Sequence, residues 1–270
     1  MHRRLQKAIT DLRDVPDHYL NDLQRRVKSH TISGKPFFDD VGAAAELAQY
    51  ELPAYFLDFE TIQFAVPIWK GTSPYKQTPF QFSVHRMSRT GNIDHQEFLD
   101  LSGRDPSRPF AEALLAACHQ AGPIYVYNAG FETARIKELS KRFLDLKNVL
   151  LALNNRVVDL LPIARKHFYD PSQSGSWSIK SVLPAIAPEL RYANLDGVQD
   201  GNMAMNAYLE AVHVETTIAR KEEIPRRRSG VSSSNIAVLI LLVWFDSGSA
   251  SRKKMKVTTD TGLHAIDADH

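Results

Sequence analysis

The sequence predicts an α/β domain in which helices flank a mixed β-sheet, with a small helical segment before it. Three strand-like segments follow one another in residues 54–99, and the second of them alternates apolar and polar residues as a strand does. Short strands and amphipathic helices then alternate up to residue 219. Antiparallel strands followed by a β-α-β-α series are typical of a mixed sheet covered by helices.

Residues 1–50 are expected to form a helical cap or to be the remnant of a longer upstream protein. Leu20, Leu23 and Val27 recur at helical spacing, and residues 41–50 are rich in alanine. This part of the chain is therefore predicted to consist of amphipathic helices.

Residues 51–219 are predicted to form the main domain. Gly91 separates the second and third strands, Pro109 occupies the first turn of a helix, and Gly122 and Pro123 end that helix. The expected strands are residues 54–59, 80–87, 93–99 and 124–127. The expected helices are residues 109–120, 131–143, 159–168, 178–187 and 203–219.

Residues 220–270 change in character, and we expect them to be a poorly ordered tail. A charged and serine-rich stretch comes first, and the apolar run 236–245 follows it. A membrane-spanning helix needs about 20 apolar residues, so this run is expected to be a buried strand or a short helix. The charged N-terminal sequence shows no signal peptide, which predicts a cytoplasmic protein without a membrane partner.

The overall charge argues against a protein that attracts nucleic acid with its whole surface. The 33 lysine and arginine residues nearly cancel the 31 aspartate and glutamate residues, and the formal net charge is +2. Any site for a polyanion must therefore be local. The lone Cys118 excludes an internal disulfide and a zinc site with several cysteines, and we expect it to be a small buried residue.

Asp58 and Glu60 are the sharpest candidates for chemistry. They are two residues apart in the strand-like sequence LDFET, so both side chains lie on one face of the strand. Two carboxylates on an apolar strand repel each other and are costly to bury, whereas a hard cation such as Mg²⁺ binds carboxylate oxygens and offsets this cost. The alternative is an ordinary polar strand end.

Glu132 belongs to a second candidate motif. The sequence YVYNAGFE, residues 125–132, predicts a strand, a tight turn that begins at Asn128, and a helix with Glu132 in its first turn. The two motifs would bring acidic side chains to the ends of two strands. The alternative is a glutamate that only interacts with the helix dipole, with Asn128 serving as a turn residue.

Taken together, the two motifs resemble those of the DEDD exonucleases in the ribonuclease H-like superfamily. Their motifs are Asp-x-Glu on the first strand and Asn-x-x-Phe-Asp before a helix, and glutamate replaces the second aspartate here. The segments 53–85, 125–132 and 156–195 resemble a bacterial domain of unknown function, DUF2779, that often follows a RecB-like nuclease region. The resemblance covers about residues 50–215. It implies a ribonuclease H-like mixed sheet with flanking helices.

The resemblance also implies a function. The chain would be a metal-dependent 3′–5′ exonuclease that acts on nucleic acid, with single strands as the expected substrate and a RecB-like nuclease region as an expected partner. Asp58 would bridge two Mg²⁺ or Mn²⁺ ions, Glu60 would hold one of them, and Glu132 would complete the shell. Such ions activate water and stabilise the leaving oxygen.

Further candidates surround these acids. Asp159 is expected to approach the metal or the substrate, or else to be a helix N-cap. Gln81 and His85 share a strand face and would position a phosphate, or else form a hydrogen-bonded pair inside the sheet. Lys180 would contact phosphate, and the alternative is a surface lysine whose stem covers apolar groups. Asn128 is assigned to substrate binding with them.

One expected part of the site is missing. The DEDD fold needs a fourth acid on a late helix, and the resemblance places it in a Tyr-x-x-x-Asp segment shortly after residue 225. No such segment follows Tyr208, and Asp246 is a stand-in with the wrong spacing. The sequence thus predicts an impaired enzyme. The alternative is a catalytically inactive module that binds nucleic acid or protein.

Overall fold

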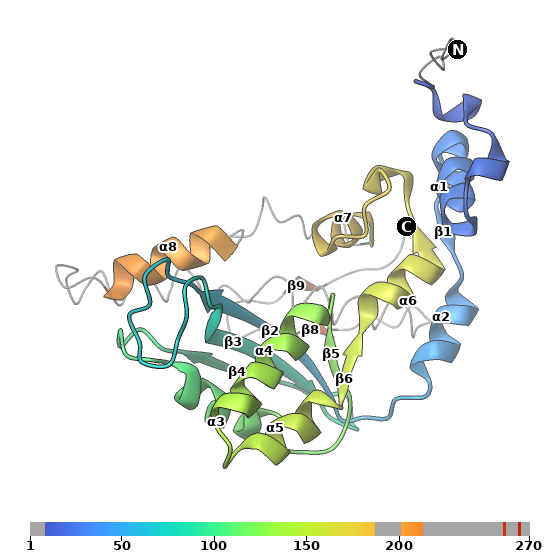
Figure 1. Ribbon diagram of the computed structural model, residues 1–270. Helices are drawn as coiled ribbons and strands as arrows, with labels where there is room; N and C mark the ends of the chain where they lie inside the picture. The colour runs from blue at the N-terminus through green and yellow to red at the C-terminus, as the bar shows by residue number, and fades with distance from the viewer. Residues whose placement is uncertain (1–8, 187–200, 213–255, 258–263, 266–270) are drawn as a thin grey trace, which may run out of the picture.

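A mixed five-stranded sheet with the strand order β4-β3-β2-β5-β6 lies at the centre of the protein (Figure 1). The structure is a computed structural model that describes residues 9–186, 201–212, 256–257 and 264–265. The strands of the sheet are β2 (Ala54–Ile62), β3 (Thr78–Met87), β4 (Ile93–Leu99), β5 (Ile124–Val126) and β6 (Val157–Asp159). β2, β3 and β4 pair antiparallel, whereas β2, β5 and β6 pair parallel.

Helices connect and cover these strands. They are α1 (Asp22–Ser33), α2 (Asp40–Leu47), α3 (Ser107–Ala117), α4 (Gly130–Arg142), α5 (Lys147–Asn154), α6 (Leu160–His167), α7 (Ile179–Ile186) and α8 (Gly201–Val212). The 3-10 helices are η1 (Leu12–Asp14), η2 (Asp17–Tyr19) and η3 (Pro171–Gln173). Two short antiparallel pairs join β1 (Phe37–Phe38) with β7 (Phe168–Tyr169) and β8 (Lys256–Val257) with β9 (His264–Ala265).

Alternation along β2 divides the apolar core into two parts. Tyr55, Leu57 and Phe59 point to one face of the sheet, where they pack with residues of α3, α4 and α5. Figure 1 shows these three helices together on one side of the sheet. Ala54 and Phe56 point to the other face, where residues of α2, α6 and α7 complete the second core. The central strand is therefore covered by helices on both faces.

The described N-terminal helices are attached to the main domain through α6 and the strand that follows it. β1 pairs with β7, and α2 contributes Ala43 and Leu47 to the second core. The Nδ1 atom of His167, at the end of α6, lies 2.8 Å from a carboxylate oxygen of Asp39, the N-cap of α2. These contacts place the helical segment on the α6 side of the sheet.

The predicted α/β class with a mixed sheet is confirmed, but some elements differ from the prediction. α5 and β6 were not predicted. Asp159 is the last residue of β6, which was not expected, and it is the N-cap of α6, which confirms the N-cap alternative for this residue. The helix expected at 203–219 is described from Gly201 to Val212.

Cys118 is buried at the C-cap of α3, as expected for a small core residue. Burial raises the pKa of its thiol to about 12, so it is not a reactive thiolate near neutral pH. In the part of the chain that the structure describes, no helix is long and apolar enough to cross a bilayer. The expected tail, including the run 236–245, lies outside the described residues except for β8 and β9.

Replacing Gly122 by alanine should be strongly destabilising. Gly122, just before β5, has φ +125°, and a Cβ there would lie 1.8 Å from the carbonyl oxygen of Pro53. Because that oxygen is backbone, the chain itself must move. We predict that Gly122→Ala lowers the free energy of unfolding by at least about 2 kcal/mol. In Gly91→Ala, φ is +82° and no atom lies within 4 Å of the new Cβ, so the loss should stay near about 1 kcal/mol. Urea unfolding of both variants tests this, and equal losses would contradict it.

Candidate functional site

Asp58 and Glu60 lie in the second half of β2, on one face of the sheet. In the antiparallel pairing with β3, Asp58 is opposite Ser83 and Glu60 is opposite Gln81. The register of the pair shifts directly after Glu60, at a β-bulge. Both acids are partly exposed. On this face of β2, the buried apolar residues Ala54 and Phe56 are thus followed by the acids Asp58 and Glu60.

Glu132 lies at the start of α4, at the end of the neighbouring strand β5. The chain leaves β5 through Asn128, whose φ of +70° lies in the left-handed region, where asparagine is tolerated better than most residues. α4 begins two residues later, which places Glu132 in its first turn. The side chain is buried, with 5% of its surface exposed, and its Oε2 atom has no hydrogen-bond partner. A buried carboxylate oxygen without a partner is costly and calls for an explanation.

The pKa of Glu132 indicates which charges surround it. Burial and, to a smaller extent, the negative charges of Asp58 and Asp159 together raise this pKa to about 8, against a backbone hydrogen bond that lowers it. These two carboxylates come from β2 and from the end of β6. We refer to Asp58, Glu132 and Asp159 as the acidic cluster. At neutral pH and without a bound cation, the Glu132 carboxyl carries its proton.

The side chain of Asp159 accepts three backbone hydrogen bonds. One oxygen accepts hydrogen bonds from the backbone N–H groups of Asn128 and Leu161, both at 2.9 Å, and the other accepts from the N–H of Ala129 at 3.0 Å. It therefore caps α6 and at the same time holds the turn that leads from β5 into α4. Since Glu132 follows that turn directly, Asp159 acts as a positioning residue for it.

The acidic cluster does not by itself complete a metal site. Within the described residues, no group of three or more His, Cys, Asp or Glu side chains has the arrangement to hold a metal ion. Glu60 is not among the charges that raise the pKa of Glu132. The geometry therefore brings Asp58 and Asp159 toward Glu132, and Glu60 lies beside them on β2. The expected two-ion shell of Asp58, Glu60 and Glu132 stays a prediction.

His85 and Gln81 share a face of β3, but their surroundings differ. Gln81 is opposite Glu60 and partly exposed. His85 is buried and stacks on His95 of β4, with ring centroids 4.5 Å apart. Burial and then the nearby His95 lower the pKa of His85 to about 4, so the ring is neutral near pH 7 and does not offer a charge to a phosphate. His95, which the sequence did not single out, also lies 2.9 Å from the Oγ atom of Ser83.

Asn128 and Lys180 occupy exposed positions at helix starts. Asn128 supplies the left-handed turn residue and its N–H donates to Asp159, which agrees with the structural alternative for this residue. Lys180 lies in the first turn of α7. Hydroxyl groups cluster beside it, and the Oγ atoms of Ser178 and Ser181 are 2.9 Å apart. The described contacts assign neither residue to a substrate.

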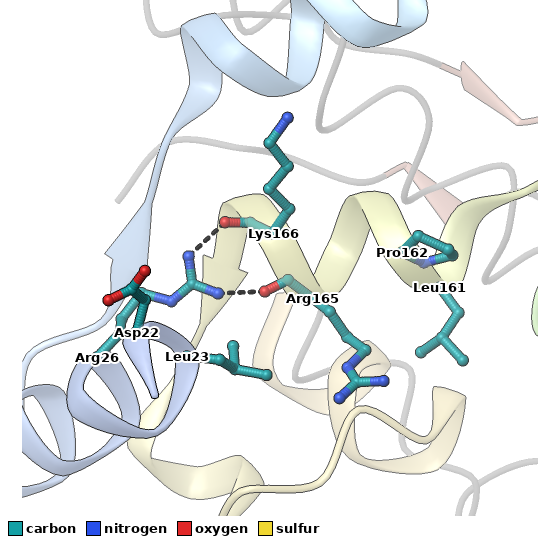
Figure 2. Close-up of a pocket in the computed structure, with 7 residues that line it drawn as sticks. All are labelled: Asp22, Leu23, Arg26, Leu161, Pro162, Arg165 and Lys166. Carbon is teal, nitrogen blue, oxygen red and sulfur yellow. Dashed lines mark hydrogen bonds between the residues drawn. The ribbon is translucent and has the colours of Figure 1, made fainter. Parts of the chain in front are cut away.

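The larger of the two described pockets is lined in part by Leu161, whose backbone N–H donates to Asp159 of the acidic cluster. It has a volume of about 470 Å³ and is open to solvent between α1 and α6. Figure 2 shows that the guanidinium group of Arg26 donates to the backbone carbonyls of Arg165 and Lys166 on its wall. Lys166 also pairs with Glu46 of α2. Arg26 and Lys166 thus attach α1 and α2 to α6, and the guanidinium group of Arg165 lies over the ring of Trp177.

Removing the Glu132 carboxyl should change how stability depends on pH. The unfolded side chain loses its proton near pH 4.5 and the folded one near pH 8, so folding takes up a proton between these values. The free energy of unfolding therefore falls as pH rises through this window. We predict that Glu132→Gln, measured by urea unfolding with a chelator, resembles the unsubstituted protein near about pH 5 and exceeds its stability by roughly 2–4 kcal/mol near about pH 8.

The exposed Glu112→Gln serves as the control for this comparison, because its side chain in α3 is about half exposed. It should leave the pH dependence unchanged. A Glu132→Gln variant whose stability follows the same pH curve as the unsubstituted protein would show that Glu132 does not take up a proton on folding.

Replacing Asp159 by asparagine should loosen the turn before α4. The amide nitrogen of Asp159→Asn cannot accept a hydrogen bond, so at least one backbone N–H loses its partner. We expect a loss of about 1–3 kcal/mol in the free energy of unfolding and a lower pKa of Glu132, followed by NMR titration, because one of the charges that raise it is gone. The control Asp170→Asn, at the N-cap of η3, should cost less and leave that pKa unchanged. Equal effects of the two substitutions would contradict the positioning role of Asp159.

Comparison with known proteins gives one match. No curated protein and no solved structure matches the chain. A family model for a domain of unknown function, DUF2779, matches residues 55–178. These residues run from the second residue of β2 to the residue before α7, and they include the whole acidic cluster. The segment that holds the sheet and the acidic cluster therefore matches the DUF2779 family.

Proposed function

We propose that the acidic cluster, with Glu60 beside it, binds a divalent cation, Mg²⁺ or Mn²⁺, and that the chain hydrolyses phosphodiester bonds of single-stranded nucleic acid. The observation that carries this proposal is the buried Glu132 carboxyl, whose Oε2 atom has no hydrogen-bond partner while Asp58 and Asp159 lie near enough to raise its pKa. The direction of attack, from the 3′ end, rests on the resemblance of the motifs to DEDD exonucleases.

The electrostatics of the cluster support a cation ligand. Glu132 is at least nine-tenths buried and has an oxygen without a partner, an arrangement that costs free energy in the protein alone. Magnesium and manganese ions favour carboxylate oxygens, and a cation among the carboxylates converts repulsion into attraction. The burial of Glu132 is thus understandable if the cluster stabilises a ligand rather than the fold.

The fold is compatible with the same proposal. The mixed sheet has antiparallel strands on one side of β2 and parallel strands on the other, with helices on both faces. We propose that it is a ribonuclease H-like sheet. Asp58 and Glu60 then lie in the second half of the central strand, and Glu132 lies in the first turn of the helix after its parallel neighbour β5. A divalent cation bound there would activate water and stabilise the leaving oxygen.

The chain's own residues would have distinct tasks. Asp58 and Glu132 would hold the cation, Glu60 would add a ligand from the same strand, and Asp159 would keep the first turn of α4 in place. Because Glu132 must release its proton before it can bind a cation, cation affinity should rise with pH toward about 8. The fourth acid expected after residue 225 lies outside the described residues, and the sequence lacks its motif. We therefore propose weak cation binding and slow hydrolysis.

A second candidate is a module that binds nucleic acid or a RecB-like nuclease region without catalysis. One observation favours it: in the described part of the chain, no three acidic, histidine or cysteine side chains already have the arrangement of a metal site. Catalysis would require the carboxylates to move together on binding a cation. The two candidates differ in whether the chain turns over a substrate.

Cation binding can be measured directly by calorimetry with Mn²⁺. We predict weak binding that tightens as pH rises toward about 8, and at least about 10-fold weaker binding in Asp58→Asn. Asp94→Asn is the control, because Asp94 is an exposed acid of β4 that pairs with Arg86. Equal binding by Asp58→Asn and the unsubstituted protein would show that the acidic cluster is not the cation site.

Hydrolysis can be followed on a single-stranded oligonucleotide labelled at its 5′ end, with Mn²⁺. The present chain should degrade it slowly or not at all. A version that carries a Tyr-x-x-x-Asp helix after residue 225 should be at least about 10²-fold faster, and Asp58→Asn should abolish that activity. If the present chain already reaches the rate of the extended version, the fourth acid is elsewhere, at Asp159, Asp200 or Asp246, and Asp200 and Asp246 lie outside the described residues. Inactivity of both versions would favour the binding module.

A further inference from the structure

The loop between β2 and β3, residues 63–77, has an inner and an outer side. Phe64 and Trp69 point inward, where their rings meet edge to face and pack against a cluster that includes Tyr208 of α8. Figure 1 shows this loop beside α8. Val66 and Ile68, by contrast, are 75% and 56% exposed. The loop therefore has its own small core and still leaves large apolar side chains in solvent.

Tyr75 is the aromatic residue on the outer side. Its side chain is 66% exposed, and its φ of +57° lies in the left-handed region, which is unfavourable for a residue with a bulky side chain. The surrounding loop enforces this conformation: the N–H of Tyr75 donates to the carbonyl of Phe64 at 2.8 Å. Strained and exposed residues of this kind are concentrated at functional sites.

Contacts with α4 hold the loop in place. The guanidinium group of Arg135 donates to the side chain of Gln77, and that of Arg142 donates to the carbonyl of Lys70 at 3.0 Å. The indole N–H of Trp69 donates to the carbonyl of Gly103 at 3.1 Å. A loop attached at these points presents its outer side chains in a fixed arrangement, which reduces the entropy lost on binding.

The position and charge of the loop suit a polyanionic ligand. Tyr75 is hydrogen bonded to Phe64, which is four residues beyond Glu60, so the backbones of Tyr75 and Glu60 are at most about 17 Å apart. About five stacked nucleotides span that distance at a rise of about 3.4 Å. Residues 63–77 contain Lys70 and Lys76 and no acidic residue, although acidic residues make up 31 of the 270 in the chain. The loop is thus a cationic, aromatic surface next to an anionic cluster.

We propose that the β2–β3 loop is the site that binds a single-stranded nucleic acid, with a base stacked on the Tyr75 ring. Val66 and Ile68 border the base, and Lys70 and Lys76 face the phosphates. Stacking on an exposed aromatic ring does not depend on the base, so the loop binds single strands without sequence preference. This inference rests on the proposed function for its substrate class, and it adds the surface that binds the strand.

The test measures binding alone. A short fluorescein-labelled single-stranded DNA is titrated with the full chain in EDTA, where a cation-dependent reaction cannot proceed, and fluorescence anisotropy gives the Kd. Tyr75→Ala should raise the Kd at least about 5-fold, and Tyr75→Phe, which keeps the ring, should stay close to the unsubstituted protein. Tyr19→Ala is the control, because Tyr19 is equally exposed, at 69%, on the N-terminal segment. Duplex DNA of the same sequence should bind more weakly, since its bases are not free to stack.

Three results would overturn the inference: no binding of the single strand by the unsubstituted chain, an unchanged Kd in Tyr75→Ala, or an equal loss in Tyr75→Phe. A loss of self-association in Tyr75→Ala, measured by sedimentation without any change in Kd, would instead assign the loop to contact with a second copy. The outcome is separate from that of the proposed function. Binding that depends on Tyr75, with no hydrolysis in Mn²⁺ by either the present chain or the extended version, would refute only the enzyme, and hydrolysis with an unchanged Kd in Tyr75→Ala would refute only the loop.

Discussion

The carboxylate of Asp159 is the interaction on which the arrangement of the acidic cluster depends. It satisfies three backbone N–H groups that belong to two different helix starts, so the turn before α4 and the start of α6 are held by a single side chain. Two parallel strands, β5 and β6, end at the same edge of the sheet, and each is followed by a helix. Without a shared acceptor, these connections would each need their own cap.

Glu132 shows the opposite situation, because its surroundings do not satisfy it. The helix N-terminus favours a negative charge, but burial and two neighbouring carboxylates oppose it more strongly and hold the side chain protonated near neutral pH. A fold selected only for stability would place an apolar residue or glutamine there. The unsatisfied Glu132 therefore bears on both proposed functions. A bound cation would offset the repulsion among these carboxylates, whereas a module that binds no cation would keep the cost of burying Glu132 beside two other acids.

The sequence was sufficient for most of the sheet and insufficient for the details of the cluster. β2, β3 and β4 span seven or more residues each, long enough for their patterns to be recognised. β6 has three residues and is defined by pairing with β5, which no local pattern reveals. Asp159 bonds to Asn128, 31 residues earlier, so sequence alone could not separate its structural role from a catalytic one. The burial of His85 likewise depends on the strand opposite.

Arg135 has a consequence for how the two ends of the site communicate. It contacts the β2–β3 loop through Gln77 and its own helix through Glu138, and it lies three residues after Glu132. If a bound nucleic-acid strand shifted the loop, the contact between Gln77 and Arg135 would pass that shift to the first turns of α4. Thermodynamic linkage then requires reciprocity: whatever factor the bound strand applies to the proton or cation affinity of Glu132, the proton or cation applies to the affinity for the strand. The affinity of such a protein for a polyanion would then depend on pH.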